Sequence, residues 1–165
     1  GMIAVDSSLG KGTTFSLYFP VEEHTIESIQ PTDNQLTNIH GGTETILLIE
    51  DEEMIAEIVK TVLVQKGYSV LTAYDGEEGL EIFQRHQKQI AVVLTDLGLP
   101  KFGGDEVFRR IKAIDAKARV ILASGFVDAA VKLEMFEKGL KRFIQKPYSH
   151  SEVLRAIRDA IDKSE

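Results

Sequence analysis

The chain has 165 residues, enough for one α/β domain and a modest extra segment but too few for two domains of ordinary size. Its 19 basic and 26 acidic residues give a net charge of −7, which argues against a nucleic-acid surface because phosphate binding needs clustered positive charge. The absence of cysteine excludes disulfides, thiol nucleophiles and thiolate metal ligands. No apolar run approaches the roughly 20 residues of a membrane-spanning helix. Gly1 before Met2 resembles a cloning scar rather than a leader, and we expect a cytoplasmic protein.

Charge and composition change near residue 43. Residues 1–43 hold one basic and five acidic residues, whereas nearly all the basic residues lie further along the chain. From 21 to 43 the residues are mostly polar and offer too little apolar surface to offset the entropy of ordering them. We therefore predict a short segment over 1–20, a linker over 21–43 and a domain over 44–165.

The first segment has the pattern of a β-hairpin. Apolar residues at Met2–Val5 and Phe15–Phe19 flank a turn at Gly10–Gly12. An isolated two-stranded hairpin is marginally stable in water, and its free edge can pair with another chain. We expect it to dock on a neighbouring molecule, giving a possible homodimer, or to be poorly ordered.

After residue 44, apolar runs of strand length alternate with segments of helical spacing. Three of the runs are almost continuously apolar, as expected for parallel strands covered on both faces. The alternation predicts an α/β fold with a doubly wound parallel sheet of five strands. The expected strands are 46–49, 68–73, 90–94, 120–123 and 143–144.

The helical segments carry start and stop signals. Met54, Ile58 and Val59 lie on the apolar face of one helix, which Gly67 would end. Two sequence patterns are typical of capping boxes at helix starts, and they are Asp75 with Glu78 and Ser149 with Glu152.

Polar side chains follow the predicted strands at the edge where such sheets bind ligands. Carboxylates about 4 Å apart repel by roughly 4 kcal/mol per pair at an effective dielectric constant of about 20, so this cluster needs a cation. Oxygen ligands without cysteine or a nearby histidine match Mg²⁺. The strand-end residues are Glu50-Asp51-Glu52-Glu53, Thr95-Asp96, Ser124-Gly125 and Lys146-Pro147.

In their order and spacing, these elements resemble the response-regulator receiver domain of two-component signalling. Separations of 45, 28 and 22 residues between Asp51, Asp96, Ser124 and Lys146 all fit that family. The resemblance covers residues 44–165 and implies a flavodoxin-like sheet of strand order 2-1-3-4-5.

The resemblance also implies a metal site. Asp51 and Asp96 would bind Mg²⁺ directly, with the backbone carbonyl of Gly98 as a third ligand and Glu50 acting mainly through water. Two departures affect this site, because the family more often has Asp at the position of Glu50 and a longer side chain at that of Gly98. Because Gly98 lacks such a side chain, the lifetime of a phosphoryl group on Asp96 is not predicted.

For the chemistry, the resemblance implies that Asp96 accepts a phosphoryl group from phosphohistidine on a histidine kinase or a histidine phosphotransfer domain. Lys146 would contact a phosphoryl oxygen, and Ser124 would hydrogen-bond the installed group. Phe143 matches the switch aromatic whose rotamer changes as the hydroxyl moves. The Lys146–Pro147 peptide bond is expected to be cis.

Two other classes compete with this interpretation. Phosphatases of the haloacid dehalogenase type also use a strand-end aspartate with Mg²⁺, but they need a second acid where this chain has Gly98. A degenerate receiver would bind partners without phosphorylation, although every required group is present here.

The first segment carries a second resemblance. Gly10-Lys11-Gly12-Thr13 and the strand after it look like the final glycine box and last strand of a sensor histidine kinase ATP-binding domain. Followed by a linker and a receiver, this order implies a hybrid histidine kinase whose parent chain could be membrane-anchored. A standalone regulator with an unrelated extension is the alternative. The fragment itself should not be a kinase, since most of a nucleotide site is missing.

Overall fold

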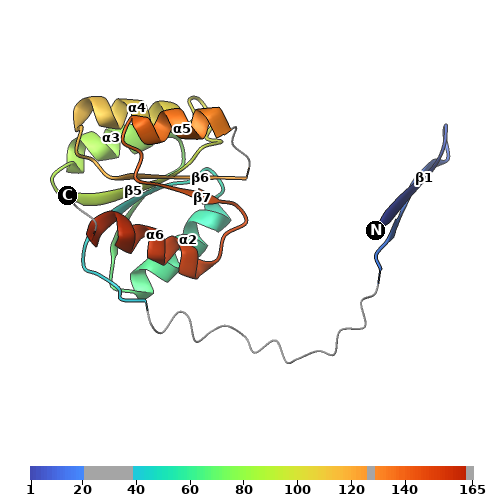
Figure 1. Cartoon of the computed structure of the whole chain (residues 1–165), viewed down its shortest axis with the longest axis horizontal. Helices are drawn as coiled ribbons and strands as arrows, with labels where there is room; N and C mark the ends of the chain where they lie inside the picture. Colours follow the sequence, from blue (N-terminus) through green and yellow to red (C-terminus); the bar gives the residue numbers. More distant parts are fainter. Residues whose placement is uncertain (21–38, 126–128, 163–165) are drawn as a thin grey trace. The chain divides into compact units, whose positions relative to one another are not determined.

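The computed structural model describes residues 1–20, 39–125 and 129–162, which belong to two compact units divided between Thr32 and Asp33 (Figure 1). Most of the predicted linker, residues 21–38, lies outside the described residues. Among the described residues, no helix is both long and apolar enough to cross a membrane.

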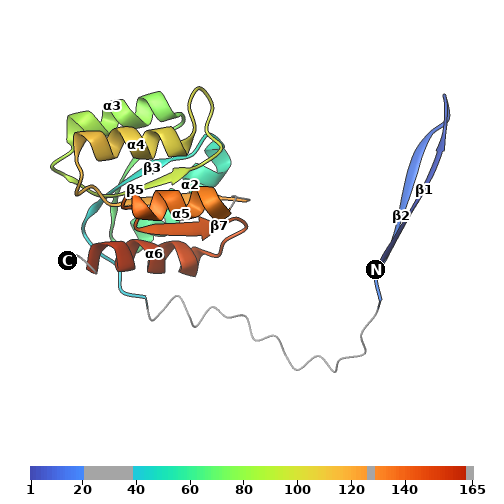
Figure 2. The same ribbon diagram turned by 45° about the horizontal axis from the view of Figure 1, so that its top comes forward.

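The first unit contains the predicted hairpin. Strands β1 (Met2–Ser8) and β2 (Gly12–Tyr18) pair antiparallel through a tight turn, as Figure 2 shows. Directly opposite residues share a face, and successive residues alternate between faces. One face is therefore strongly apolar and the other mixed. The apolar face consists of Ile3, Val5, Phe15 and Leu17, each 57–62% exposed.

The second unit is built on the predicted five-stranded parallel sheet. Its spatial order is β4-β3-β5-β6-β7, which is 2-1-3-4-5 when its own strands are counted, and the predicted fold class is confirmed. The strands are β3 (Thr45–Ile49), β4 (Ser69–Ala73), β5 (Ile90–Asp96), β6 (Val120–Ser124) and β7 (Arg142–Gln145).

Helices cover both faces of this sheet, in the layers visible in Figure 1. Buried residues of α2 and α6 pack on one face, and those of α3, α4 and α5 pack on the other. The central strands are therefore apolar on both sides. The helices are α2 (Glu53–Gln65), α3 (Gly76–His86), α4 (Gly104–Ile114), α5 (Ala129–Glu137) and α6 (His150–Asp162).

The predicted helix signals are confirmed. The Glu78 amide donates to Asp75 Oδ1 at 2.9 Å, which caps α3. At the start of α6 the Ser149 amide donates to Glu152 Oε2 at 2.7 Å, and the Glu152 amide donates back to Ser149 Oγ at 3.3 Å. Gly67 follows α2 with a φ of 92°.

Only part of the apolar face of α2 is covered. Ala56, Val59 and Leu63 are buried against the sheet and α6, whereas Met54 is 80% exposed and Ile58 54% exposed. The apolar arc of this helix is wider than the strip that its neighbours cover. Met54 and Ile58 consequently remain at the surface.

The residues just before β3 pack tightly on the rest of the second unit, and we call residues 39–44 the docked connector. The Gly42 amide donates to the Lys66 carbonyl at 3.1 Å. A Cβ at Gly41 would lie 1.8 Å from that same oxygen, so only glycine fits there. The Arg158 guanidinium, on α6, donates to Glu44 Oε1 at 3.0 Å and to the Gly41 carbonyl at 3.3 Å.

Candidate functional site

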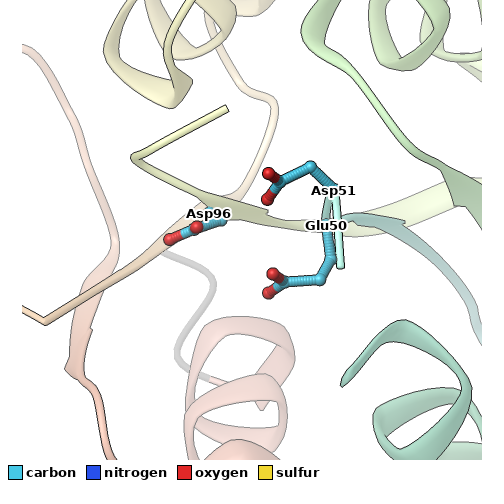
Figure 3. Close-up of side chains that lie close together, drawn as sticks. All are labelled: Glu50, Asp51 and Asp96. Atoms are coloured by element: carbon cyan, nitrogen blue, oxygen red, sulfur yellow. The ribbon is translucent and has the colours of Figure 1, made fainter. Parts of the chain in front are cut away.

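Three carboxylates meet where the two central strands end. Glu50 and Asp51 follow β3, while Asp96 is the last residue of the neighbouring β5, and Ile49 pairs in register with Thr95. One oxygen of each carboxylate lies within 4.8 Å of one oxygen of the other two. Figure 3 shows the three side chains extending to the same side of the strand ends. The predicted clustering at this sheet edge is therefore present.

The three acids differ in burial. Glu50 is only 2% exposed, the Asp96 side chain is 14% exposed, and Asp51 lies at the surface. Burial, together with the neighbouring charges of Asp96 and Asp51, raises the pKa of Glu50 despite the attraction of Lys146. The cluster therefore combines a buried carboxylate with one that faces solvent.

Lys146 supplies the compensating charge. Its Nζ lies 2.9 Å from Glu50 Oε2 and 3.2 Å from Asp96 Oδ2, so one ammonium bridges the two central strands. Burial alone would lower the pKa of Lys146, but the hydrogen bonds and charges of these two carboxylates raise it overall. The Lys146–Pro147 peptide bond is cis, as predicted.

The backbone fixes the position of Asp96. The Leu97 amide donates to Asp96 Oδ1 at 2.8 Å and also reaches the Ala123 carbonyl at 2.9 Å. Gly104, at the start of α4, packs against the main chain of Asp96 so closely that a Cβ there would lie 2.1 Å from the Asp96 carbonyl oxygen. One carboxylate oxygen is thus held by the backbone, while the other faces Lys146.

Ser124 and Phe143 occupy the same face of the sheet on neighbouring strands. Ser124 ends β6 and is 9% exposed, and Leu122, two residues earlier, pairs in register with Phe143 on β7. Residues two apart in a strand share a face, which places Ser124 next along that face toward the acidic edge. The Phe143 ring is half-buried, and Lys132 Nζ of α5 lies 5.0 Å from its centroid.

Gly98, the remaining predicted site residue, is exposed on the loop after Asp96. A Cβ at this position would lie 3.6 Å from Asp96 Oδ2, an ordinary contact distance. The loop therefore leaves room for a side chain beside the carboxylate, in contrast to the tight packing at Gly104.

The residues present fit a magnesium ion. Three carboxylates from two adjacent strand ends offer only hard oxygen donors, in a cluster small enough for a single cation. The one ammonium of Lys146 does not neutralise three carboxylates when all are ionised. Asp51 is the most exposed of the three carboxylates.

Sequence reasoning missed two contributors to this site. Gly104 supports Asp96 through close backbone packing, and a Gly-Gly pair at a helix start gives no sign of what it touches. Tyr148 lines a cavity of about 450 Å³ with Ile55, Lys146 and Pro147. Burial raises the pKa of the Tyr148 hydroxyl. The aromatic residue two positions after Lys146 was the available signal.

Comparisons with known proteins agree with this fold. The chemotaxis protein CheY of Bacillus subtilis is 30% identical over 118 residues, which are 71% of this chain and 97% of CheY. The sensor kinase CckA of Brucella abortus is 25% identical over 100% of this chain, which spans only 18% of that kinase. The crystal structure of a receiver domain protein from Clostridium thermocellum has a TM-score of 0.69 and 34% identity, covering 73% of this chain and 95% of that one. The sequence model described as response regulator receiver domain matches residues 46–158, and the chain belongs to this family of two-component signalling domains.

Proposed function

We propose that Asp96 is the phosphoryl acceptor of this receiver domain and that a phosphohistidine is its donor. The observation that carries the proposal is the cluster at the carboxyl edge of the sheet, where Lys146 Nζ bridges Asp96 and Glu50. Among the acids of the cluster, Asp96 has one oxygen held by a backbone amide and the other beside the ammonium. That arrangement orients a carboxylate for attack.

In the proposed step, an Asp96 carboxylate oxygen attacks the phosphorus of phosphohistidine. The new O–P bond forms as the N–P bond breaks, and the bonding electron pair leaves on the imidazole nitrogen of the donor. Lys146 offsets negative charge on the phosphoryl oxygens, and Ser124 donates a hydrogen bond to the group once it is attached. Such transfer depends mostly on positioning and charge stabilisation.

Asp51, Asp96 and the Gly98 carbonyl would hold a magnesium ion, with Glu50 acting through water. When bound, Mg²⁺ neutralises carboxylate charge and polarises phosphoryl oxygens. Position 50 is Glu in this chain, where the family more often has Asp. The longer side chain still belongs to the cluster, because a Glu50 oxygen lies within 4.8 Å of an oxygen of Asp51 and of Asp96.

The donor surface in this proposal adjoins the acidic edge. Met54 and Ile58 expose apolar side chains on α2, and the cavity beside Lys146 is lined by Ile55 and Tyr148. A helical donor carrying its histidine between apolar residues could cover this surface while it presents the phosphoryl group to Asp96. Donor recognition and chemistry would then share one face of the domain.

We further propose that the chain is the C-terminal part of a hybrid sensor kinase. Support comes from the alignment with CckA, which extends through residues 1–20, and from the one-sided apolar hairpin expected of strands taken from a larger sheet. A cytoplasmic location is part of the same proposal and rests on the acidic, cysteine-free composition.

Phosphorylation with a small phosphodonor tests the central proposal. Acetyl phosphate with MgCl₂ should add one phosphoryl group to the parent chain, and peptide mapping should place it on Asp96. Asp96→Asn should abolish the labelling. Asp162→Asn, an exposed acid paired with Arg158 on α6, is the matched control and should label normally. Full labelling of Asp96→Asn would overturn the assignment, and an unlabelled parent would favour a degenerate receiver.

A further inference from the structure

The loop after Asp96 contains a strained turn at a residue that is not glycine. The Phe102 amide donates to the Pro100 carbonyl at 2.9 Å, which closes a three-residue turn with Lys101 at its centre. Lys101 has a φ of 68°. A γ-turn with positive φ is the rare and strained form, and a residue with a side chain rarely adopts it. Something must hold Lys101 in this conformation.

The side chain of Lys101 is tied to a different element. Its Nζ lies 2.8 Å from Asp75 Oδ2 and 3.1 Å from Glu77 Oε2, at the start of α3. Asp75 is also the residue that caps α3, so the ammonium is attached to a fixed point. The hydrogen bond from Lys101 lowers the pKa of Asp75, and those to Asp75 and Glu77 raise the pKa of Lys101.

The rest of the loop is anchored on both sides of the turn. Leu99 is buried at 7% exposure, and the half-buried Phe102 ring has the Arg110 guanidinium of α4 at 4.5 Å from its centroid. The strained turn thus lies between anchored neighbours, and Gly98 is three residues before its centre. Release of Lys101 would let the segment that carries Gly98 relax.

We propose that Lys101 is a positioning residue for the acidic site, which holds the turn at 100–102 against α3 and thereby fixes the Gly98 backbone beside Asp96. It touches neither the carboxylate cluster nor a substrate. This inference rests on the proposed function in one respect, the role of the Gly98 carbonyl as a metal ligand. Whether Lys101 holds the turn at 100–102 does not depend on that role.

Ion pairs at the surface usually contribute little, and Lys101 is 54% exposed. Here one ammonium meets two carboxylates at hydrogen-bond distance and opposes a strained backbone. We therefore expect removal of the Lys101 ammonium to weaken metal binding only moderately. The effect should fall below the roughly 10–100-fold loss of metal affinity that is typical when a group bonded directly to a ligand is removed.

Amide hydrogen exchange of Phe102 in the metal-free full chain reports the turn directly. Lys101→Met removes both ion pairs but keeps the strain, and should speed this exchange by about threefold to tenfold. Lys101→Arg keeps the charge and should exchange like the parent. Lys101→Gly removes the strain as well as the ion pairs, and should fall between the parent and Lys101→Met. Lys60→Met, which removes the exposed lysine paired with Glu57 on α2, is the control and should change nothing.

Titration with MnCl₂, followed by the electron paramagnetic resonance signal of free Mn²⁺, reports the site. Lys101→Met should weaken Mn²⁺ binding by about threefold to tenfold, while Lys101→Arg and Lys60→Met bind like the parent. Parent-like exchange and Mn²⁺ affinity in Lys101→Met would overturn the inference, as would a Lys101→Gly variant no better protected than Lys101→Met. Labelling of Asp96→Asn would instead overturn the proposed function and leave the exchange result intact.

Discussion

Lys146 and Glu50 form an ion pair, with 2.9 Å between Nζ and Oε2, in which the carboxylate is almost completely buried and the ammonium is 22% exposed. The same ammonium reaches Asp96, so a single positive charge serves two acids from two strands. Lys146 should therefore affect both the free energy of unfolding and the rate of phosphorylation, and experiments can measure these two effects separately.

Lys146→Met should weaken the metal-free fold but strengthen metal binding. Without the ammonium, the buried Glu50 charge is uncompensated, and the free energy of unfolding should fall by about 3 kcal/mol. Mg²⁺ should then bind several-fold more tightly, because a competing cation is gone, while phosphorylation slows by about tenfold or more. Urea unfolding with and without MgCl₂ and labelling by acetyl phosphate measure the three effects. Unchanged labelling would exclude a role for Lys146 in transfer.

Two glycines near Asp96 should respond differently to alanine. Gly104→Ala places a Cβ 2.1 Å from the Asp96 carbonyl oxygen, and the backbone shift should cost about 1–3 kcal/mol of stability and slow phosphorylation. Gly98→Ala meets only an ordinary contact and should fold like the parent. Its effect should appear in the lifetime of the phosphate on Asp96. Chemical denaturation and the decay of labelled protein distinguish the two, and equal stability of both variants would contradict the packing argument.

Ser124→Ala should accept phosphate but switch less. Ser124 lies on the sheet face that also carries Phe143, so a hydroxyl drawn toward a phosphoryl group would vacate space near the ring. A ligand shifts a two-state equilibrium only by its difference in affinity for the two states, and this hydrogen bond supplies part of that difference. Beryllofluoride should therefore produce smaller amide shifts around Phe143 in the variant than in the parent. Equal shifts in the two proteins would count against this route.

Glu44 should contribute stability that disappears in acid. Hydrogen bonding from Arg158 lowers the pKa of Glu44 below 4.5 despite the opposing effect of partial burial. Such a group stabilises the fold above its unfolded-state pKa, and the contribution is lost as the pH falls through the folded-state pKa. Glu44→Gln should reduce the free energy of unfolding by about 1 kcal/mol at pH 7, and the difference from the parent should shrink as the pH falls below 4.5. Urea unfolding at pH 7, 5 and 3 checks this, and a constant difference would refute it.

The hairpin should affect association but not phosphorylation. Its apolar face is exposed, and an isolated hairpin is only marginally stable. Phe15→Glu places a charge in the middle of that face and should lower any self-association seen by sedimentation, with labelling of Asp96 unchanged. Ser16→Glu, on the mixed face opposite Ala4, is the control. Mg-ATP should give no heat in calorimetry, whereas tight binding would contradict the kinase-remnant proposal.

The sequence allowed the sheet and the meeting of Glu50, Asp51 and Asp96 to be predicted, because strand ends in a parallel sheet necessarily share an edge. The strand order was implied by the resemblance to receiver domains. Local capping patterns were equally informative, since Asp75 and Ser149 act within one helical turn. These features depend either on short-range geometry or on topology alone.

Contacts between residues far apart in the sequence could not be predicted. The contact of Gly104 with the Asp96 backbone and the reach of Lys101 to Asp75 depend on how a loop folds over a neighbouring helix. No periodicity encodes such contacts. The partial exposure of α2 was hidden for a similar reason, because Met54 and Ile58 have the same apolar character as their buried neighbours.

The docked connector determines where this protein can be truncated or fused to another domain. Thr45 begins the first strand of the receiver, yet Gly42 is hydrogen-bonded to Lys66, and Gly41 and Glu44 are hydrogen-bonded to Arg158, on the body of the domain. A truncation at Thr45 would remove those attachments and leave Arg158 without its main partner. Partner domains should therefore be joined before Ile39, so that these attachments are kept and the fusion point lies at the N-terminal end of β3, away from Asp96 at the carboxyl end of β5.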